Sequence, residues 1–158
     1  MVVQKASGDH GFLSNLYKAE IEFEGRKFPT SEHAYQFGKF KAVPGSPSYE
    51  IDLQAREWAM QAPKAHLLAI VAHGLFSWDI ALGWASIKVD RMHRVLQAKF
   101  TQHDDLKIKL LDTSDAVLIE ASNTDSFWGV GKKGTGQNIL GKLLMQVRND
   151  LRNEPHQD

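Results

Sequence analysis

The segment from Trp84 to Phe100 limits the possible folds more than any other part of the chain. Its apolar residues recur at intervals of three or four: Ala85, Val89, Met92, Leu96 and Phe100. This spacing matches the turn of an α-helix and places the side chains on one stripe. Such a stripe must be covered by other elements, so we expect a fold built around a long core-facing helix.

A second amphipathic segment lies near the end of the chain. It begins near Asn138, and asparagine is a favourable cap for the start of a helix. Its apolar side chains again follow the helical period: Leu140, Leu143, Leu144, Val147 and Leu151. Arg148 and Arg152 stand towards its C-terminal end, where the helix dipole favours cations. We therefore expect a second core helix.

Shorter helical patterns fill much of the remaining chain. The hydroxyl groups of Pro29-Thr30-Ser31 can cap a helix that runs to about Lys41. Further helices are expected over residues 49–60, 63–73 and 106–111. The 49–60 helix should present one side to the framework, formed by Ile51, Ala55 and Trp58.

Strand patterns are few. Ile21 and Phe23 alternate with acidic residues, Glu24-Gly25 supplies turn chemistry, and Phe28 resumes the apolar side, which predicts a small hairpin. A buried strand is expected over residues 116–119. The fold class predicted from these patterns is α+β, mainly helical, with a small β component.

Composition narrows the class of protein. The 158 residues, 42% hydrophobic and 24% charged, fit one globular domain over residues 1–158. Basic and acidic residues number 19 each, so the net charge of zero gives no general attraction to nucleic acid or membrane. The absence of cysteine excludes disulfides and thiolate chemistry. We find neither a signal-peptide pattern nor an apolar run that could span a bilayer, and so expect a cytoplasmic protein.

Three polar residues share a face of the helix that follows Thr30. Glu32, Gln36 and Lys39 are four and three residues apart, and Tyr35 borders them. Two interpretations are open: a solvated face with an ion pair, or a functional set. The histidines are scattered, and no pair has the HExxH spacing of a metal site.

A glycine-containing loop precedes the last helix. Residues 128–134 match the glycine fingerprint of dinucleotide-binding folds, but that fingerprint requires a strand directly before it and an acidic residue on the next strand. The chain ends inside a helix instead, which excludes a Rossmann fold. What remains is either a surface turn or a helix N-terminus suited to a phosphate or carboxylate. Trp84 and Trp128 are either core residues or stacking platforms for a base or ribose.

Several segments taken together carry a family resemblance. In order they are Phe12-Leu13-Ser14-Asn15-Leu16, Pro29-Thr30-Ser31-Glu32-His33-Ala34-Tyr35-Gln36 with Lys39, Trp84 with Met92, Lys99-Phe100-Thr101-Gln102, Leu118-Ile119-Glu120-Ala121-Ser122, Asp125-Ser126-Phe127-Trp128-Gly129 with Gly131, and Gly136-Gln137-Asn138-Ile139-Leu140-Gly141 with Leu144-Met145 and Arg148. From Phe12 to about Leu151 the chain resembles the YbiA-like (NADAR) family. It departs from many members over residues 65–74, which contain no arginine.

The resemblance implies a mainly helical α+β fold and an N-glycosidase activity. The substrate would be a ribosylamine nucleotide-like compound, such as an early intermediate of riboflavin biosynthesis. Two alternatives stay open: an ADP-ribosyl-guanine hydrolase that reverses ADP-ribosylation of nucleic acid, and a non-catalytic module that binds ADP-ribose or a nucleotide. Partners would be a small ribosyl phosphate or ADP-ribose-type molecule, nucleic acid only as an ADP-ribosylated substrate, and no membrane.

Residue roles follow from this chemistry. Breaking a ribosyl–nitrogen bond builds positive charge on the sugar and negative charge on the leaving nitrogen, which requires a carboxylate and a proton donor. Glu32 is the first candidate carboxylate, and its place in a first helical turn should keep it ionised. Lys39 is an alternative that would form a Schiff base with the opened sugar. Asp90 and Asp125 are secondary acids.

The remaining predicted site residues would bind the substrate. Asn15 and Asn138 offer amides to the ribose hydroxyls, Trp128 offers a stacking surface, and the amides of Gly129 and Gly131 would contact a phosphate. The rest of the predicted binding set is His33, Gln36 and Trp84. No metal and no organic cofactor is expected.

Overall fold

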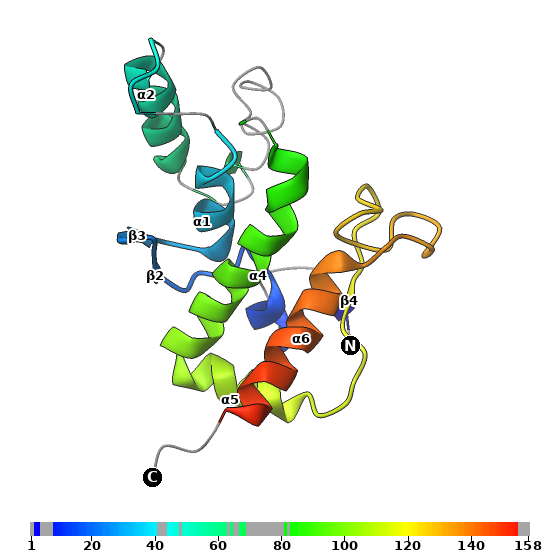
Figure 1. Cartoon of the computed structure of the whole chain (residues 1–158). Helices are drawn as coiled ribbons and strands as arrows, with labels where there is room; N and C mark the ends of the chain where they lie inside the picture. The colour runs from blue at the N-terminus through cyan, green and yellow to red at the C-terminus, as the bar shows by residue number, and fades with distance from the viewer. Residues whose placement is uncertain are drawn as a thin grey trace.

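A computed structural model describes residues 2–3, 8–40, 44–47, 49–62, 64, 67–68, 81 and 83–154 (Figure 1). The helices are α1 (Ser31–Phe37), α2 (Tyr49–Met60), α4 (Trp84–Gln102), α5 (Asp104–Asp112) and α6 (Ile139–Asn153), with a short 3₁₀ helix, η1 (Gly11–Leu13). The strands are β1 (Val2–Val3), β2 (Ile21–Phe23), β3 (Arg26–Phe28) and β4 (Ile119–Glu120). The predicted class, α+β and mainly helical, is confirmed.

Two small sheets supply the β component. Strands β2 and β3 form the predicted antiparallel hairpin, in which Ile21 pairs with Phe28. Glu24 and Gly25 both have positive φ, 51° and 75°, as a type I′ hairpin turn requires. In the second sheet β1 runs parallel to β4. The strand predicted over residues 116–119 lies later in the chain, at Ile119–Glu120.

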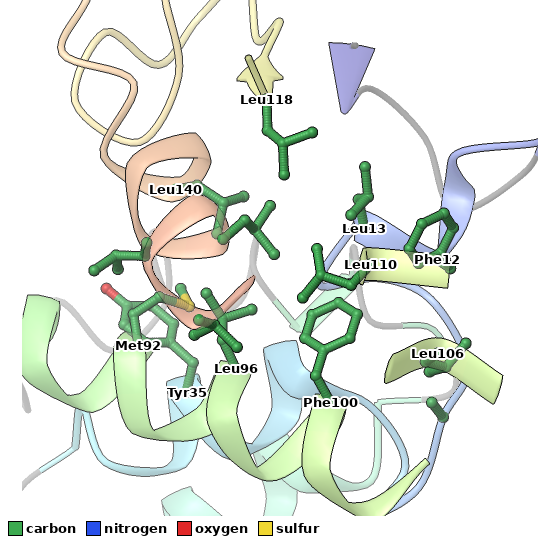
Figure 2. Packing of buried hydrophobic residues seen from close by; sticks show 14 of the residues in the cluster. Phe12, Leu13, Tyr35, Met92, Leu96, Phe100, Leu106, Leu110, Leu118 and Leu140 are labelled. Atoms are coloured by element: carbon green, nitrogen blue, oxygen red, sulfur yellow. The ribbon is translucent and has the colours of Figure 1, made fainter. Parts of the chain in front are cut away.

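Helix α4 runs through the middle of the fold, with α6 packed along it and α1 against its other side (Figure 1). The predicted stripe is buried at Met92, Leu96 and Phe100, which pack against Leu140 of α6 and Leu110 of α5 (Figure 2). Ala85 is exposed, so the stripe is covered only beyond the first turn of α4. Most of the core therefore lies beside the C-terminal half of α4.

Helix α6 buries the apolar face that its sequence predicted. The core also takes in Arg148, whose Nη1 donates to Thr113 Oγ1 (2.7 Å) and to the carbonyl of Ala116 (2.9 Å). The expected cap at Asn138 is wrong. Asn138 has a left-handed backbone with φ 52°, and its side chain bonds to the chain near β4 instead of to the helix amides.

Helix α2 has the predicted bounds but the opposite orientation. Ile51 and Trp58 are 70% and 53% exposed, so the prediction that they face the framework is wrong. Polar contacts anchor the helix: Arg56 donates to the carbonyl of Phe40, and Glu57 pairs with Arg26. The helical period shows which side chains share a face, but it does not show which face meets the rest of the protein.

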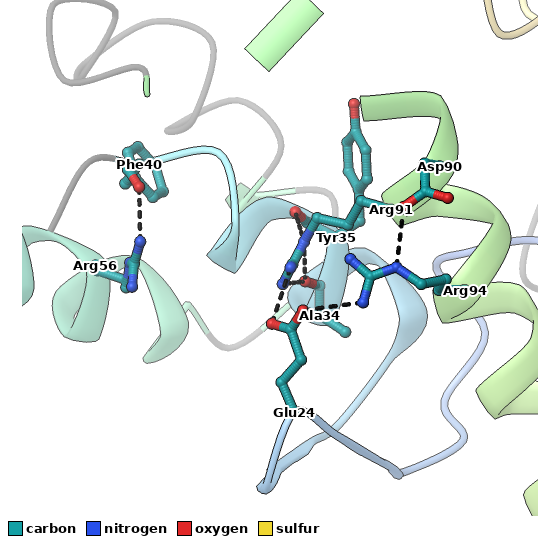
Figure 3. A network of polar contacts seen from close by, with 8 residues as sticks. All are labelled: Glu24, Ala34, Tyr35, Phe40, Arg56, Asp90, Arg91 and Arg94. Carbon is teal, nitrogen blue, oxygen red and sulfur yellow. Dashed lines mark hydrogen bonds and ion pairs between the residues drawn. The ribbon is translucent and has the colours of Figure 1, made fainter. Parts of the chain in front are cut away.

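Helix α1 ends at Phe37, before the predicted end at Lys41. The guanidinium of Arg91 on α4 donates to the last carbonyls of α1, those of Ala34 and Tyr35, and pairs with Glu24 (Figure 3). This capping interaction comes from an element distant in sequence. The helix predicted over residues 63–73 lies mostly outside the described residues. No helix in the described part of the chain is long and apolar enough to cross a membrane.

Candidate functional site

A cavity of about 480 Å³ opens between η1 and its following loop, α1, α4 and the loop after β4. Its polar lining combines acids, amines, amides and hydroxyls: Ser14, Asn15, Glu32, Gln36, Lys39, Lys88, Glu120, Ser122, Thr124 and Asp125. Its apolar and aromatic lining consists of Leu16, Tyr35, Trp84, Met92, Trp128 and Leu140. Segments far apart in sequence thus meet at one hollow.

Helix α1 supplies one wall of the cavity. The hydroxyl of Thr30 accepts from the backbone N–H of His33 (3.3 Å), which is the predicted N-cap. The next turns bring Glu32, Gln36 and Lys39 to the cavity, and Gln36 Nε2 donates to Glu32 Oε1 (2.8 Å). Because Gln36 and Lys39 are buried, this face is a pocket wall and not a solvated surface.

The segment after η1 holds this wall in place. The backbone N–H of Glu32 donates to the carbonyl of Asn15 (3.1 Å), and Asn15 Nδ2 donates to Met92 Sδ (3.2 Å). Two buried amide oxygens, Asn15 Oδ1 and Gln36 Oε1, have no hydrogen-bond partner among the described residues. Buried acceptors normally have partners, so these two oxygens are suited to a ligand's hydroxyl or amino groups.

Aromatic side chains form another part of the cavity. Tyr35 lies between Trp84 and Trp128, with ring centroids 5.1 Å and 5.6 Å away. Lys88, one turn after Trp84 on α4, places its Nζ 3.8 Å from the ring centroid of Phe127. The arrangement puts flat apolar surfaces beside an ammonium group, as a nucleotide-like ligand requires.

The charges at the α1 wall shift one another's pKa. Burial raises the pKa of Glu32, while the hydrogen bond from Gln36 and the charge of Lys39 oppose that shift. The expectation that the first helical turn keeps Glu32 ionised is therefore wrong in direction. Burial lowers the pKa of Lys39, the charge of Glu32 opposes this, and the charge of Lys88 adds to it. Both groups are thus moved towards their neutral forms.

Two acids lie close together at the end of β4 and on the loop that follows it, Glu120 and Asp125. Burial, followed by the charge of Asp125, raises the pKa of Glu120 to about 7. Asp125 Oδ1 accepts from the backbone N–H groups of Phe127 and Trp128, both at 2.8 Å. Burial and the charges of Glu32 and Asp125 raise the pKa of Tyr35, whose hydroxyl is hydrogen bonded to Trp128. Two of the three acids that line the cavity, Glu32 and Asp125, therefore act on Tyr35.

The predicted anion contact at the glycine loop does not hold for Gly131, whose amide is already used. The N–H of Gly131 donates to the carbonyl of Asp125 (3.1 Å), and the N–H groups of Ile139 and Leu140 donate to loop carbonyls at 3.1 Å and 3.0 Å. The first turn of α6 is therefore already satisfied by the protein's own backbone. Gly129 packs against Glu120 and, like Gly131, is not part of the cavity lining.

Three other predicted site residues have structural partners away from the cavity lining. His33 Nδ1 lies 2.8 Å from Thr30 Oγ1, and its Nε2 lies 3.4 Å from the carbonyl of Ala62. Asp90 pairs with Arg94 on the surface of α4 (Figure 3).

The third of these residues, Asn138, joins the start of α6 to the chain at β4. Its Oδ1 accepts from the N–H of Glu120 and its Nδ2 donates to the carbonyl of Leu118, both at 2.9 Å. The cavity does bring together seven predicted site residues: Asn15, Glu32, Gln36, Lys39, Trp84, Asp125 and Trp128.

Sequence reasoning did not place Lys88 or Glu120 at the site. The sequence nevertheless contains an indication for each of these two residues. Lys88 lies one turn from Trp84 and one turn from Met92, so the three share a face of α4. Glu120 is an acid directly after an apolar strand pattern, at the point where a buried strand leaves the core. Within the described ranges no group of three His, Cys, Asp or Glu side chains is arranged to hold a metal ion.

Comparisons with known proteins agree on one family. The profile of the NADAR domain matches residues 3–152. The chain is 35% identical over 145 residues to the N-glycosidase YbiA of Escherichia coli, covering 92% of this chain and 84% of that protein. It is 36% identical over 143 residues to a riboflavin biosynthesis protein of Vibrio vulnificus, of which it covers 36%. The solved structure of E. coli YbiA superposes with a TM-score of 0.77 at 33% identity, over 96% of this chain and 84% of the other.

Proposed function

This chain belongs to the NADAR family and is a hydrolase of N-glycosyl bonds, and we propose that it cleaves the ribosyl–nitrogen bond of a riboflavin-pathway intermediate in the cavity. The choice of this cavity as the active site rests on one observation: the carboxylate of Glu32 lies in the cavity wall and is oriented by a hydrogen bond from Gln36. The substrate is a small molecule that combines a ribosyl phosphate with an amino-substituted heterocycle.

Glu32 acts at the sugar. As the bond breaks, positive charge develops on the sugar carbon, and an ionised carboxylate beside it stabilises that charge or takes a proton from the attacking water. Burial strengthens Glu32 as a base because it raises the pKa of the carboxyl. The amide of Gln36 keeps one carboxylate oxygen in place, which leaves the other for water.

Lys39 offers an alternative, covalent route to cleavage of the same bond. A ribosylamine opens to an imine, and a neutral lysine amine can replace the leaving amine to form a Schiff base that water then hydrolyses. Burial lowers the pKa of Lys39, which increases the fraction of neutral amine at a given pH. Borohydride would trap such an adduct on the wild-type protein and not on Lys39→Ala. No adduct, with activity intact in Lys39→Ala, leaves Lys39 with an electrostatic role alone.

The rest of the lining matches the other parts of this substrate. Lys88 provides positive charge for a phosphate, in place of the Gly131 amide that the backbone has already used. The oxygens of Asn15 and Gln36 that lack partners accept hydrogen bonds from ribose hydroxyls. Trp84 and Trp128 stack on the heterocycle.

The experiment compares the wild-type protein with Glu32→Gln on a ribosylaminopyrimidine phosphate, following released ribose phosphate. We expect kcat of the variant to fall by about 10²–10⁴-fold, the usual contribution of a positioned proton-transfer group, with the fold intact by circular dichroism. Glu22→Gln, an exposed acid on β2, is the matched control and should retain full activity. A fully active Glu32→Gln removes Glu32 from the mechanism.

A second substrate in the same assay distinguishes a riboflavin-pathway substrate from an ADP-ribose-type substrate. DNA carrying ADP-ribosylated guanine tests whether the cavity accepts an ADP-ribose-type substrate, with release of ADP-ribose as the readout. Release from the small metabolite alone supports the riboflavin-pathway function, and release from DNA assigns de-ADP-ribosylation. Release from neither contradicts the proposed hydrolysis and favours a module that binds its ligand without cleaving it.

A further inference from the structure

The backbone of Glu120 is fixed from both sides where β4 meets the cavity. Its N–H donates to Asn138 Oδ1 (2.9 Å), and its carbonyl accepts from the N–H of Val130 (2.9 Å). Gly129 lies against the residue: a Cβ on Gly129 would come within 2.6 Å of the Glu120 carbonyl oxygen and 3.1 Å of its Cγ. The absence of a side chain at Gly129 therefore leaves the room that Glu120 occupies.

The carboxyl of Glu120 faces the cavity without a protein partner. It lines the cavity and is partly buried, yet no hydrogen bond or ion pair to it is found among the described residues. Asp125, its acidic neighbour, differs because two backbone amides already occupy one of its carboxylate oxygens. Of these two acids, Glu120 is thus the one with neither carboxylate oxygen taken by a described protein group.

The other carboxyl of the cavity, Glu32, has a different set of neighbours. Its interactions are with Gln36 and Lys39, whereas the charged group that acts on Glu120 is Asp125. Burial raises the pKa of both carboxyls, but the charge of Lys39 opposes that shift at Glu32, while the charge of Asp125 adds to it at Glu120. Two carboxyl groups whose surroundings differ in this way are suited to opposite roles in one reaction.

From this geometry, and resting on the proposed function, we propose that Glu120 is the catalytic acid that protonates the leaving nitrogen. As the bond between the sugar carbon and nitrogen breaks, its electron pair goes to the nitrogen, which takes the proton of the Glu120 carboxyl. The water oxygen bonds to the sugar carbon and gives a proton to Glu32. Exchange of one proton between each carboxyl and solvent restores both groups, so one water is consumed.

The protonation state of Glu120 suits this role at neutral pH. Burial and Asp125 raise its pKa to about 7, so the carboxyl still carries its proton in a large fraction of molecules there. The other ionisable groups of the cavity are Glu32, Tyr35 and Lys39 from the α1 segment and Lys88 from α4. Because the acid must be protonated, we expect kcat to fall as the pH rises through about 7.

The test is the pH profile of kcat on the ribosylaminopyrimidine phosphate, for wild type and Glu120→Gln. We expect Glu120→Gln to lose about 10²–10⁴-fold in kcat at pH 6.5 or below, and its residual rate to lack the fall above about pH 7. Affinity for the product ribose 5-phosphate should stay within a few fold, because the sugar contacts are intact. Formate should restore part of the activity of Glu120→Ala, which a purely structural role would not allow.

Each outcome decides one hypothesis. Wild-type turnover with an equally active Glu120→Gln overturns the role of Glu120 and leaves the proposed function standing. A wild-type protein without any turnover overturns the proposed function itself. If Glu120→Gln does not fold, the wild-type profile still decides: a kcat that stays constant from pH 6 to pH 9 contradicts an acid with a pKa near 7, and a fall across that range supports it.

Discussion

The two halves of helix α4 meet different surroundings. In the C-terminal half, Leu96 and Phe100 are fully buried among leucines and aromatic rings from α5, α6 and η1 (Figure 2). In the N-terminal half, Trp84 and Lys88 line the cavity together with unpartnered amide oxygens and acids from other segments. One helix therefore joins a closely packed apolar core to a region where polar groups line a cavity.

The same contrast separates two buried lysines. Lys99 in the core has no carboxylate beside it among the described residues and donates to the carbonyls of Phe12 (2.6 Å) and Ser14 (2.9 Å), which fixes the segment leading to Asn15. At the cavity, the charges of Glu32 and Lys88 both act on the pKa of Lys39, in opposite directions. Buried amines therefore occur in two settings in this fold: beside backbone carbonyls in the core, and beside other ionisable groups at the cavity.

The core half of α4 should respond to truncation through stability. Leu96→Ala removes a fully buried side chain and leaves a cavity, and should lower the free energy of unfolding by about 2–5 kcal/mol. Urea denaturation followed by circular dichroism measures it, and the fraction that remains folded should keep its kcat. A loss below 1 kcal/mol contradicts the distinction drawn between the two halves.

Lys99 should make stability depend on pH. Burial lowers its pKa to about 7, far below that of an exposed lysine, so above pH 7 the unfolded chain binds a proton that the folded protein has released. The contribution of Lys99 to stability should therefore rise as the pH increases from about 7 towards 10. The free energy of unfolding of Lys99→Met, subtracted from that of wild type across this range, isolates the effect. A difference that does not change with pH contradicts it.

The smallest effect is expected on α2. Ile51 is 70% exposed although its spacing suggested a framework position, so Ile51→Gln should change the free energy of unfolding by no more than about 0.5 kcal/mol. Thermal denaturation beside Leu96→Ala provides the comparison under one set of conditions. A loss of stability as large as that of Leu96→Ala indicates that this face of α2 is covered.

Local patterns predicted the elements better than their orientation. The hairpin, the bounds of α2 and the apolar face of α6 follow from spacing and turn chemistry that each segment carries within itself. The exposed face of α2 and the early end of α1 do not, because Arg56, Glu57 and Arg91 hold those helices through partners distant in the chain. For the same reason Asp90 and Asn138 resembled site residues in sequence and have structural partners in the fold.

By itself the sequence determined the family, the mainly helical class and the face of α1 that carries Glu32, Gln36 and Lys39, since ordered motifs and helical periods are local properties. Only the tertiary structure decided that this face meets Lys88 and Glu120, and that Gly131 donates its amide to the loop's own backbone. The pKa of a carboxyl depends on burial and on charges brought near it from other segments. Those neighbours are set by packing, and so the surroundings on which the proposed roles of Glu32 and Glu120 rest became visible only in the folded chain.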